Sequence, residues 1–261
     1  GTGNTHLLGA VRRYAFSKGL RFVLVDMTDV KVFWETVLQG YISSLQQDGP
    51  NGIPQYQSLL KCLLSKTNSP IPLEHLVPAP TPRLNTTAKF ILSNLVRQDR
   101  HNTIRFQDVI RALLLLNSDN FDAKNAGYIW LQGVEVHEAE KTAFEFSRVS
   151  LAPKDIVEGL SWLMSLKGPS VLAFDQLDAV VAQYYTLAGV AEDKITEEQE
   201  AARAIAKSII GGIGNGFLSL RDSTIQTLSL LSCLEATWKI LTSETISTDR
   251  DRFRDPILLG T

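Results

Sequence analysis

The chain is poor in the residues that build disulfide frameworks and transition-metal centres. Its 261 residues include two cysteines, Cys62 and Cys233, and four histidines. The cysteines are far apart and lack the paired spacing of a zinc site, so we expect two buried free thiols in a reducing compartment. The histidines are scattered along the chain. Neither residue type predicts a metal or disulfide framework.

A long apolar run and a strong net charge are also lacking. No stretch approaches the roughly 18 apolar residues of a membrane span, and the first residues do not resemble a signal peptide. Lys and Arg number 26 against 28 Asp and Glu, and the net charge of −2 gives no general attraction to nucleic acid or to an anionic membrane. We therefore expect a soluble cytoplasmic protein without membrane contact. Nucleic-acid binding would require a local patch or other parts of the protein.

What the chain does contain is the composition of an ordinary globular protein, with 44% apolar and 21% charged residues. Apolar runs predict buried strands at 21–26, 171–175 and 226–232, each ending at or next to polar side chains, with Asp26 at the end of the first. Most of the remaining sequence has helical periodicity. We predict an α/β fold, with a mostly parallel sheet flanked by helices.

The first residues have the composition of a phosphate-binding loop that leads into a helix. Such a loop needs glycines so that backbone N–H groups converge on anionic oxygens, and the helix that follows adds free N–H groups and a favourable dipole. Gly3 fits the second glycine of the pattern, Thr5 fits the magnesium-binding hydroxyl, and Asn4 stands at the lysine position. The first glycine would precede residue 1, so we expect the chain to begin inside the motif. The predicted nucleotide-binding residues are Gly1, Thr2, Gly3, Asn4, Thr5 and His6. The alternative is a glycine-rich tail before an ordinary amphipathic helix.

A later segment supplies the acids that such a loop requires. Four apolar residues, 171–174, precede Asp175, as in a buried parallel strand whose carboxyl end faces a ligand crevice. We predict that Asp175 holds Mg²⁺ together with Thr5, and that Asp178 orients or deprotonates the attacking water. Alternatively, Asp175 is the N-cap of the helix that follows the strand.

The two segments together resemble the Walker A and Walker B motifs of P-loop NTPases of the AAA+ and STAND-like group. Gly-Thr-Gly-Asn-Thr-His-Leu-Leu is similar to their G-x-G-K-T-H-L-L start. Phe-Asp-Gln-Leu-Asp is similar to their Walker B strand, which ends in acidic residues. The resemblance covers roughly half of the chain and implies a P-loop fold that binds ATP and Mg²⁺. It places Gln176 where many members have the catalytic glutamate, Asp178 at the second acid, and Ser232 at the strand end that senses the outer phosphate.

Two departures from that pattern bear on catalysis. Asn4 supplies no positive charge to the transferred phosphoryl group, and Gln176 supplies no carboxylate, so we expect slow hydrolysis. Two functions therefore stay open. One is an ATPase that serves as a switch or motor in a larger assembly, and a DNA-handling or defence role for it rests on the resemblance alone. The other is a catalytically inactive ATPase-fold module that binds protein partners.

The spacing of the strands predicts a large helical insertion. Roughly 120 residues of mainly helical sequence lie between the first two predicted strands, whereas a βαβ crossover needs only about a dozen. We predict a nucleotide-binding core at 1–48 and 150–261 and an inserted helical subdomain at 49–149 that contacts protein partners. Expected helices in and after this insert are 54–65, 84–98, 105–117, 121–131, 137–147 and 153–167.

Three features near the end of the chain complete the predictions. The glycine-rich segment 211–216 has no preceding strand and no following Lys-Ser or Lys-Thr pair, so we expect a flexible helix break there. Residues 238–241 are expected to form a helix or a short fifth strand. In the charge-alternating tail, Arg252 is a candidate to reach a γ-phosphate in cis or from a neighbouring subunit of a homo-oligomer. The alternative for Arg252 is pairing with the interleaved aspartates.

Overall fold

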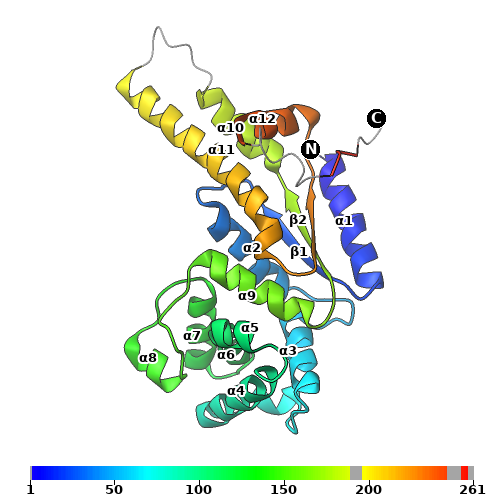
Figure 1. Ribbon diagram of the computed structural model, residues 1–261, viewed down its shortest axis with the longest axis vertical. Helices are drawn as coiled ribbons and strands as arrows, with labels where there is room; N and C mark the ends of the chain where they lie inside the picture. The colour runs from blue at the N-terminus through cyan, green and yellow to red at the C-terminus, as the bar shows by residue number, and fades with distance from the viewer. Residues whose placement is uncertain (1, 189–195, 246–253, 258–261) are drawn as a thin grey trace.

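A three-stranded parallel sheet forms the centre of the protein (Figure 1). The computed structural model describes residues 2–188, 196–245 and 254–257. The strands are β1 (Arg21–Asp26), β2 (Ser170–Asp175) and β3 (Thr227–Leu231), arranged in the order β1-β2-β3. All three predicted strands are confirmed to within a residue or so. The parallel α/β class is confirmed, while the P-loop fold stays a prediction.

The helices follow the apolar periodicity of the sequence closely. Those before β2 are α1 (Thr2–Ser17), α2 (Phe33–Gln46), α3 (Gln55–Lys66), the 3₁₀ helix η1 (Leu73–Leu76), α4 (Thr81–Leu95), α5 (Arg100–Arg105), α6 (Gln107–Leu116), α7 (Phe121–Leu131), α8 (Glu138–Ala143) and α9 (Pro153–Ser165). Those after it are α10 (Leu177–Ala188), α11 (Glu197–Ser223) and α12 (Glu235–Thr245). No helix in the described part of the chain is long and apolar enough to cross a membrane.

Both faces of the sheet are covered, which explains why β2 is buried along its whole length. On one face, Phe22 and Val171 pack against Leu8 and Ala15 of α1. Side chains alternate along a strand, so Leu172 and Phe174 point to the opposite face, where α2, α9 and α11 pack. This two-sided burial is typical of a parallel sheet, and it limits polar residues to the two ends of the strands.

The direction of α1 relative to the strands determines which end of this helix lies at each end of the sheet. A tight turn closes α1, with Gly19 at φ +72° and the Leu20 N–H donating to the Ala15 carbonyl at 2.9 Å. The chain then enters β1 in the reverse direction. The N-terminus of α1 therefore lies at the carboxyl end of the strands, and its C-terminus lies at their amino end (Figure 1).

The helices from α3 to α8 gather beyond the amino end of the sheet (Figure 1). Helix α6 lies at their centre, with every residue from Asp108 to Leu116 buried. The expected helices of this region are confirmed, with the stretch 105–117 divided into the end of α5 and α6. These helices belong to the same hydrophobic cluster as α2, α9 and one face of the sheet. An inserted subdomain at 49–149 therefore stays a prediction.

The predicted helix break at 211–216 is wrong, because α11 continues through it to Ser223. A Cβ atom on Gly216 would lie 2.2 Å from the Phe33 ring. Glycine at this position allows α11 to approach α2 closely, and Phe33 and Phe217 then pack edge to face at 5.2 Å. Gly216 therefore serves helix packing rather than flexibility, whereas a Cβ atom on Gly211 or Gly212 would meet open space. Residues 238–241 lie in α12, so the helical alternative holds there.

Candidate functional site

The carboxyl end of the sheet brings together three polar residues from three neighbouring strands. Asp26 pairs in register with Asp175. Ser232 follows β3, and its N–H donates to the Phe174 carbonyl at 3.5 Å, which places it next to Asp175 on the other side. Register alone therefore creates a polar edge of Asp26, Asp175 and Ser232.

The central contact of this edge joins the two segments that the sequence singles out. The Thr5 hydroxyl donates to Oδ2 of Asp175 at 3.1 Å, across 170 residues of sequence. Asp175 is buried, with 8% of its surface exposed. Its other oxygen, Oδ1, accepts a hydrogen bond from the Gln176 N–H at 2.9 Å. Each carboxylate oxygen accepts one of these hydrogen bonds and so keeps a lone pair for a further ligand.

Gln176 has an unusual backbone conformation. Its φ of 65° lies in the left-handed region, which a residue with a side chain rarely adopts. This conformation turns the chain sharply from β2 into α10 and directs the Gln176 N–H back to Asp175. The Gln176 side chain is exposed. The turn therefore fixes the Asp175 carboxylate and leaves the neighbouring amide side chain open to solvent.

The first turn of α1 lies next to these acids, as the Thr5 contact requires. The first N–H groups of a helix have no intrahelical partners, and the helix dipole favours negative charge there. Thr5 and His6 are exposed in this turn. For Thr2, Gly3 and Asn4 only the helical backbone is described, and Gly1 and Arg252 lie outside the described residues.

Asp26 is a strand-end acid that was not among the predicted site residues. Its Oδ1 accepts hydrogen bonds from the Thr28 N–H at 2.9 Å and the Thr28 hydroxyl at 2.6 Å. The sequence signal for Asp26 is its place at the end of an apolar strand. What the sequence does not give is the parallel register that sets it opposite Asp175.

The oxygen atoms of this edge suit a hard divalent cation. Adjacent ligands of an octahedral Mg²⁺ lie about 3 Å apart, given metal–oxygen distances of about 2.1 Å. The separation of the Thr5 hydroxyl and the Asp175 carboxylate, 3.1 Å, matches that spacing. The described residues contain no group of three or more His, Cys, Asp or Glu able to hold a metal. Mg²⁺ typically takes one or two carboxylates and completes its shell with water and phosphate, so Thr5 and Asp175 are the residues that could hold such an ion.

Asp178 has a contact that its predicted catalytic role does not require. Its Oδ1 accepts a hydrogen bond from the Leu234 N–H at 2.8 Å and so ties the start of α10 to the segment before α12. Burial, together with the negative charge of Asp178, raises the pKa of the Cys233 thiol to about 11. Asp178 thus lies at the same end of the sheet as Asp175 but faces the segment that follows β3.

Comparisons with protein-family models, with curated proteins and with solved structures find no match to this chain.

Proposed function

We propose that this chain binds ATP with Mg²⁺ at the carboxyl end of its sheet and serves as a nucleotide-dependent switch or motor in a larger assembly. The observation that carries the proposal is the contact between Thr5 and Asp175 beside the first turn of α1. A hydroxyl and an acid from distant segments meet where free helix N–H groups attract anions.

Each described residue has a defined task in this proposal. The α1 N–H groups bind phosphate oxygens, and Thr5 and Asp175 hold Mg²⁺ from the protein side, with Asp26 as a second acid beside Asp175. Mg²⁺, when bound, neutralises charge on the phosphate oxygens. Ser232, on the other side of Asp175, is the candidate to contact the outer phosphate.

Turnover is proposed to be slow. Gln176 has a neutral side chain that can orient a water molecule but cannot accept its proton as a carboxylate does. The Asp178 carboxylate is engaged with Leu234. These two observations favour a second candidate function, a non-hydrolysing ATPase-fold module that binds protein partners through the helices α3 to α8.

Thermal stability in the presence of nucleotide tests the proposal. At a hundredfold excess over Kd, a ligand adds about 2.7 kcal/mol to the free energy of unfolding. For a protein of this size that corresponds to a rise in Tm of roughly 5 to 10 °C. We expect this rise with Mg²⁺ and ATP, a loss of the rise in Asp175→Ala, and the full rise in the control Asp119→Ala, which removes an exposed acid elsewhere. No rise in the wild type, or an equal rise in Asp175→Ala, would contradict ATP binding at this site.

A further inference from the structure

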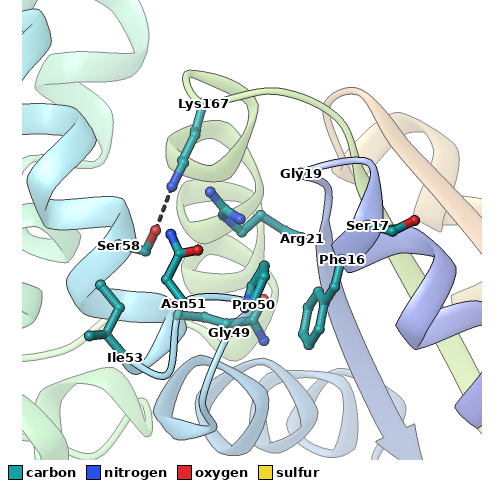
Figure 2. Close-up of a pocket in the computed structure, with 11 residues that line it drawn as sticks. Phe16, Ser17, Gly19, Arg21, Gly49, Pro50, Asn51, Ile53, Ser58 and Lys167 are labelled. Atoms are coloured by element: carbon teal, nitrogen blue, oxygen red, sulfur yellow. Dashed lines mark hydrogen bonds between the residues drawn. The ribbon is translucent and has the colours of Figure 1, made fainter.

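A second polar site lies at the opposite, amino end of the sheet. A pocket of about 380 Å³ opens there between the end of α1, the start of β1, the loop 49–53, α3 and the segment before β2. Figure 2 shows the side chains of Arg21, Lys167, Ser58 and Asn51 pointing toward one another inside it. This pocket has no part in the proposed nucleotide site, because the full length of the strands separates the two.

Arg21 is the most unusual residue of the pocket. Only 3% of its surface is exposed, and its Nε and Nη2 atoms are buried without a hydrogen-bond partner. Burial lowers the pKa of its guanidinium group. Leaving a buried donor unpaired costs stability, more so when the group is charged. Because Arg21 is the first residue of β1, the sheet fixes its backbone and the side chain has little freedom to escape to solvent.

Lys167 adds a second cation to the same space. Its ammonium group donates to the Ser58 hydroxyl, and burial and the positive charge of Arg21 lower the pKa of Lys167. Within the described part of the chain, no carboxylate forms an ion pair with Arg21 or Lys167. Two cations that repel each other, one of them with unpaired N–H groups, therefore face this space, with the Cys62 thiol near both.

The walls of the pocket are held in place before any ligand binds. The loop 49–53 is closed by a hydrogen bond from the Gly49 N–H to the Ile53 carbonyl at 2.8 Å. The buried side chain of Gln55 donates to the carbonyls of Phe22 at 3.0 Å and Ser44 at 2.8 Å, and accepts from the Phe22 N–H at 3.3 Å. Gln55 thereby joins α3 to β1 and α2 and fixes the distance across the pocket.

We propose that this pocket binds the phosphate group of a small phosphorylated molecule, with Arg21 and Lys167 as its charged ligands. A phosphate monoester carries nearly two negative charges at neutral pH and matches the two cations. The guanidinium fork presents paired N–H donors to two phosphate oxygens, and the ammonium group of Lys167 binds a third as a point charge. The Asn51 amide and the Phe16 ring line the remaining wall and are available to the rest of the ligand.

The pocket volume limits the ligand to a small molecule. About 380 Å³ lies near the lower end of the range for small-molecule sites, so one phosphate group and a compact organic part fill it. Inorganic phosphate and a phosphomonoester would make the same contacts with Arg21 and Lys167. Only the organic part of a phosphomonoester would also contact Phe16 and Asn51 and so add to the binding affinity.

The test is calorimetric titration of the full chain with inorganic phosphate, and in parallel with glycerol 3-phosphate, at fixed ionic strength and with saturating ATP and Mg²⁺ present. The titration is repeated without ATP, because ATP bound at the amino end would compete with phosphate. Binding that is lost only when ATP is present would contradict the proposed function, whereas absence of binding under both conditions would contradict the present inference. We expect saturable one-to-one binding, at least tenfold weaker in Arg21→Met and in Lys167→Met. The control Lys124→Met, which removes an exposed lysine of α7, should bind as the wild type does.

Both pocket variants are expected to fold. Arg21→Met removes an unpaired buried charge, and Lys167→Met alters a residue at the rim. If one variant nevertheless fails to fold by circular dichroism, the other decides. Tighter binding of glycerol 3-phosphate than of phosphate assigns a phosphomonoester, and equal binding assigns free phosphate. Absence of saturable binding in the wild type, or equal binding in Arg21→Met, Lys167→Met and Lys124→Met, would overturn the inference.

Discussion

The two ends of the sheet carry opposite polar chemistry, although the same strands and the same helix build both. At the carboxyl end, Asp26, Asp175 and the Thr5 hydroxyl gather oxygen ligands around the start of α1. At the amino end, Arg21 and Lys167 place two positive charges beyond the end of α1. In the two proposals, the first end binds a phosphate together with a metal ion, and the second binds a phosphate without one.

The two ends also differ in how well their buried groups are satisfied. Both oxygens of Asp175 accept hydrogen bonds within the protein, whereas two nitrogen atoms of Arg21 have no partner. A carboxylate that is already oriented can add a metal ligand with little rearrangement. An anion in the pocket would supply the hydrogen bonds that the Arg21 guanidinium lacks. The comparison therefore predicts that ligand binding changes local stability more at the amino end.

The largest effect on stability is expected from Gln55→Leu, which removes the hydrogen bonds that join α3 to β1 and α2 at the amino end. The substitution leaves the N–H and carbonyl of Phe22 and the carbonyl of Ser44 without their buried partner. At about 1 to 3 kcal/mol for each unsatisfied group, we expect a loss of roughly 3 kcal/mol in the free energy of unfolding. Chemical denaturation measures it, and Gln39→Leu, the same change on the exposed face of α2, is the control. Equal stability of the two variants would show that Gln55 does not hold this end together.

A smaller effect is expected from restoring the missing charge at the carboxyl end. Asn4→Lys places a cation in the first turn of α1, where it can stabilise the transferred phosphoryl group. We expect the rate of ATP hydrolysis to rise at least tenfold, which corresponds to about 1.4 kcal/mol in the activation free energy. Steady-state phosphate release measures the rate, and Ala10→Lys, farther along the same helix, is the control. An unchanged rate in a folded, nucleotide-bound Asn4→Lys variant would favour the non-hydrolysing module.

The smallest effect concerns the loop that follows β3. The pKa of Cys233 is raised to about 11, first by burial and then by Asp178. The folded-state pKa of this thiol lies above its unfolded-state pKa. Its contribution to the free energy of unfolding is therefore fully present below the unfolded-state pKa and is lost as pH rises through the folded-state pKa. Asp178→Asn removes the negative charge, so the pH dependence of Cys233 alkylation should shift to lower pH. Mass spectrometry of alkylated peptides separates Cys233 from Cys62, which serves as an internal control. An unchanged pH dependence in Asp178→Asn would contradict an effect of the Asp178 charge on the pKa of Cys233.

Much of the fold was accessible from the sequence, because apolar periodicity reports burial directly. The runs at 21–26 and 171–175 form β1, which is mostly buried, and β2, which is buried throughout, and the segments 54–65 and 121–131 form α3 and α7. The contact between the first residues and Asp175 was also predictable, because a phosphate-binding loop and an acidic strand end form a nucleotide site only together. The glycine-rich segment 211–216 misled the prediction, because the close approach of Gly216 to Phe33 is a tertiary requirement without a local signal.

The amino-end pocket could not be predicted for a similar reason. Arg21 precedes an apolar run and has the sequence context of an exposed strand end, where a charged residue needs no explanation. Its burial follows from the loop 49–53 and from Lys167, which lies far along the chain. Likewise, the pairing of Asp26 with Asp175 depends on strand order and register. Contacts between distant segments decide both sites.

The most direct test of the central claim is calorimetric titration with ATP in the presence and absence of Mg²⁺, on two variants that each alter one end of the sheet. Asp175→Asn keeps the size of the side chain and removes the charge that holds the metal, and Arg21→Met alters only the amino end. We predict that Asp175→Asn abolishes the Mg²⁺-dependent part of ATP binding, and that Arg21→Met binds ATP as tightly as the wild type. Loss of ATP binding in Arg21→Met with retention in Asp175→Asn would contradict the assignment and move the nucleotide to the amino end.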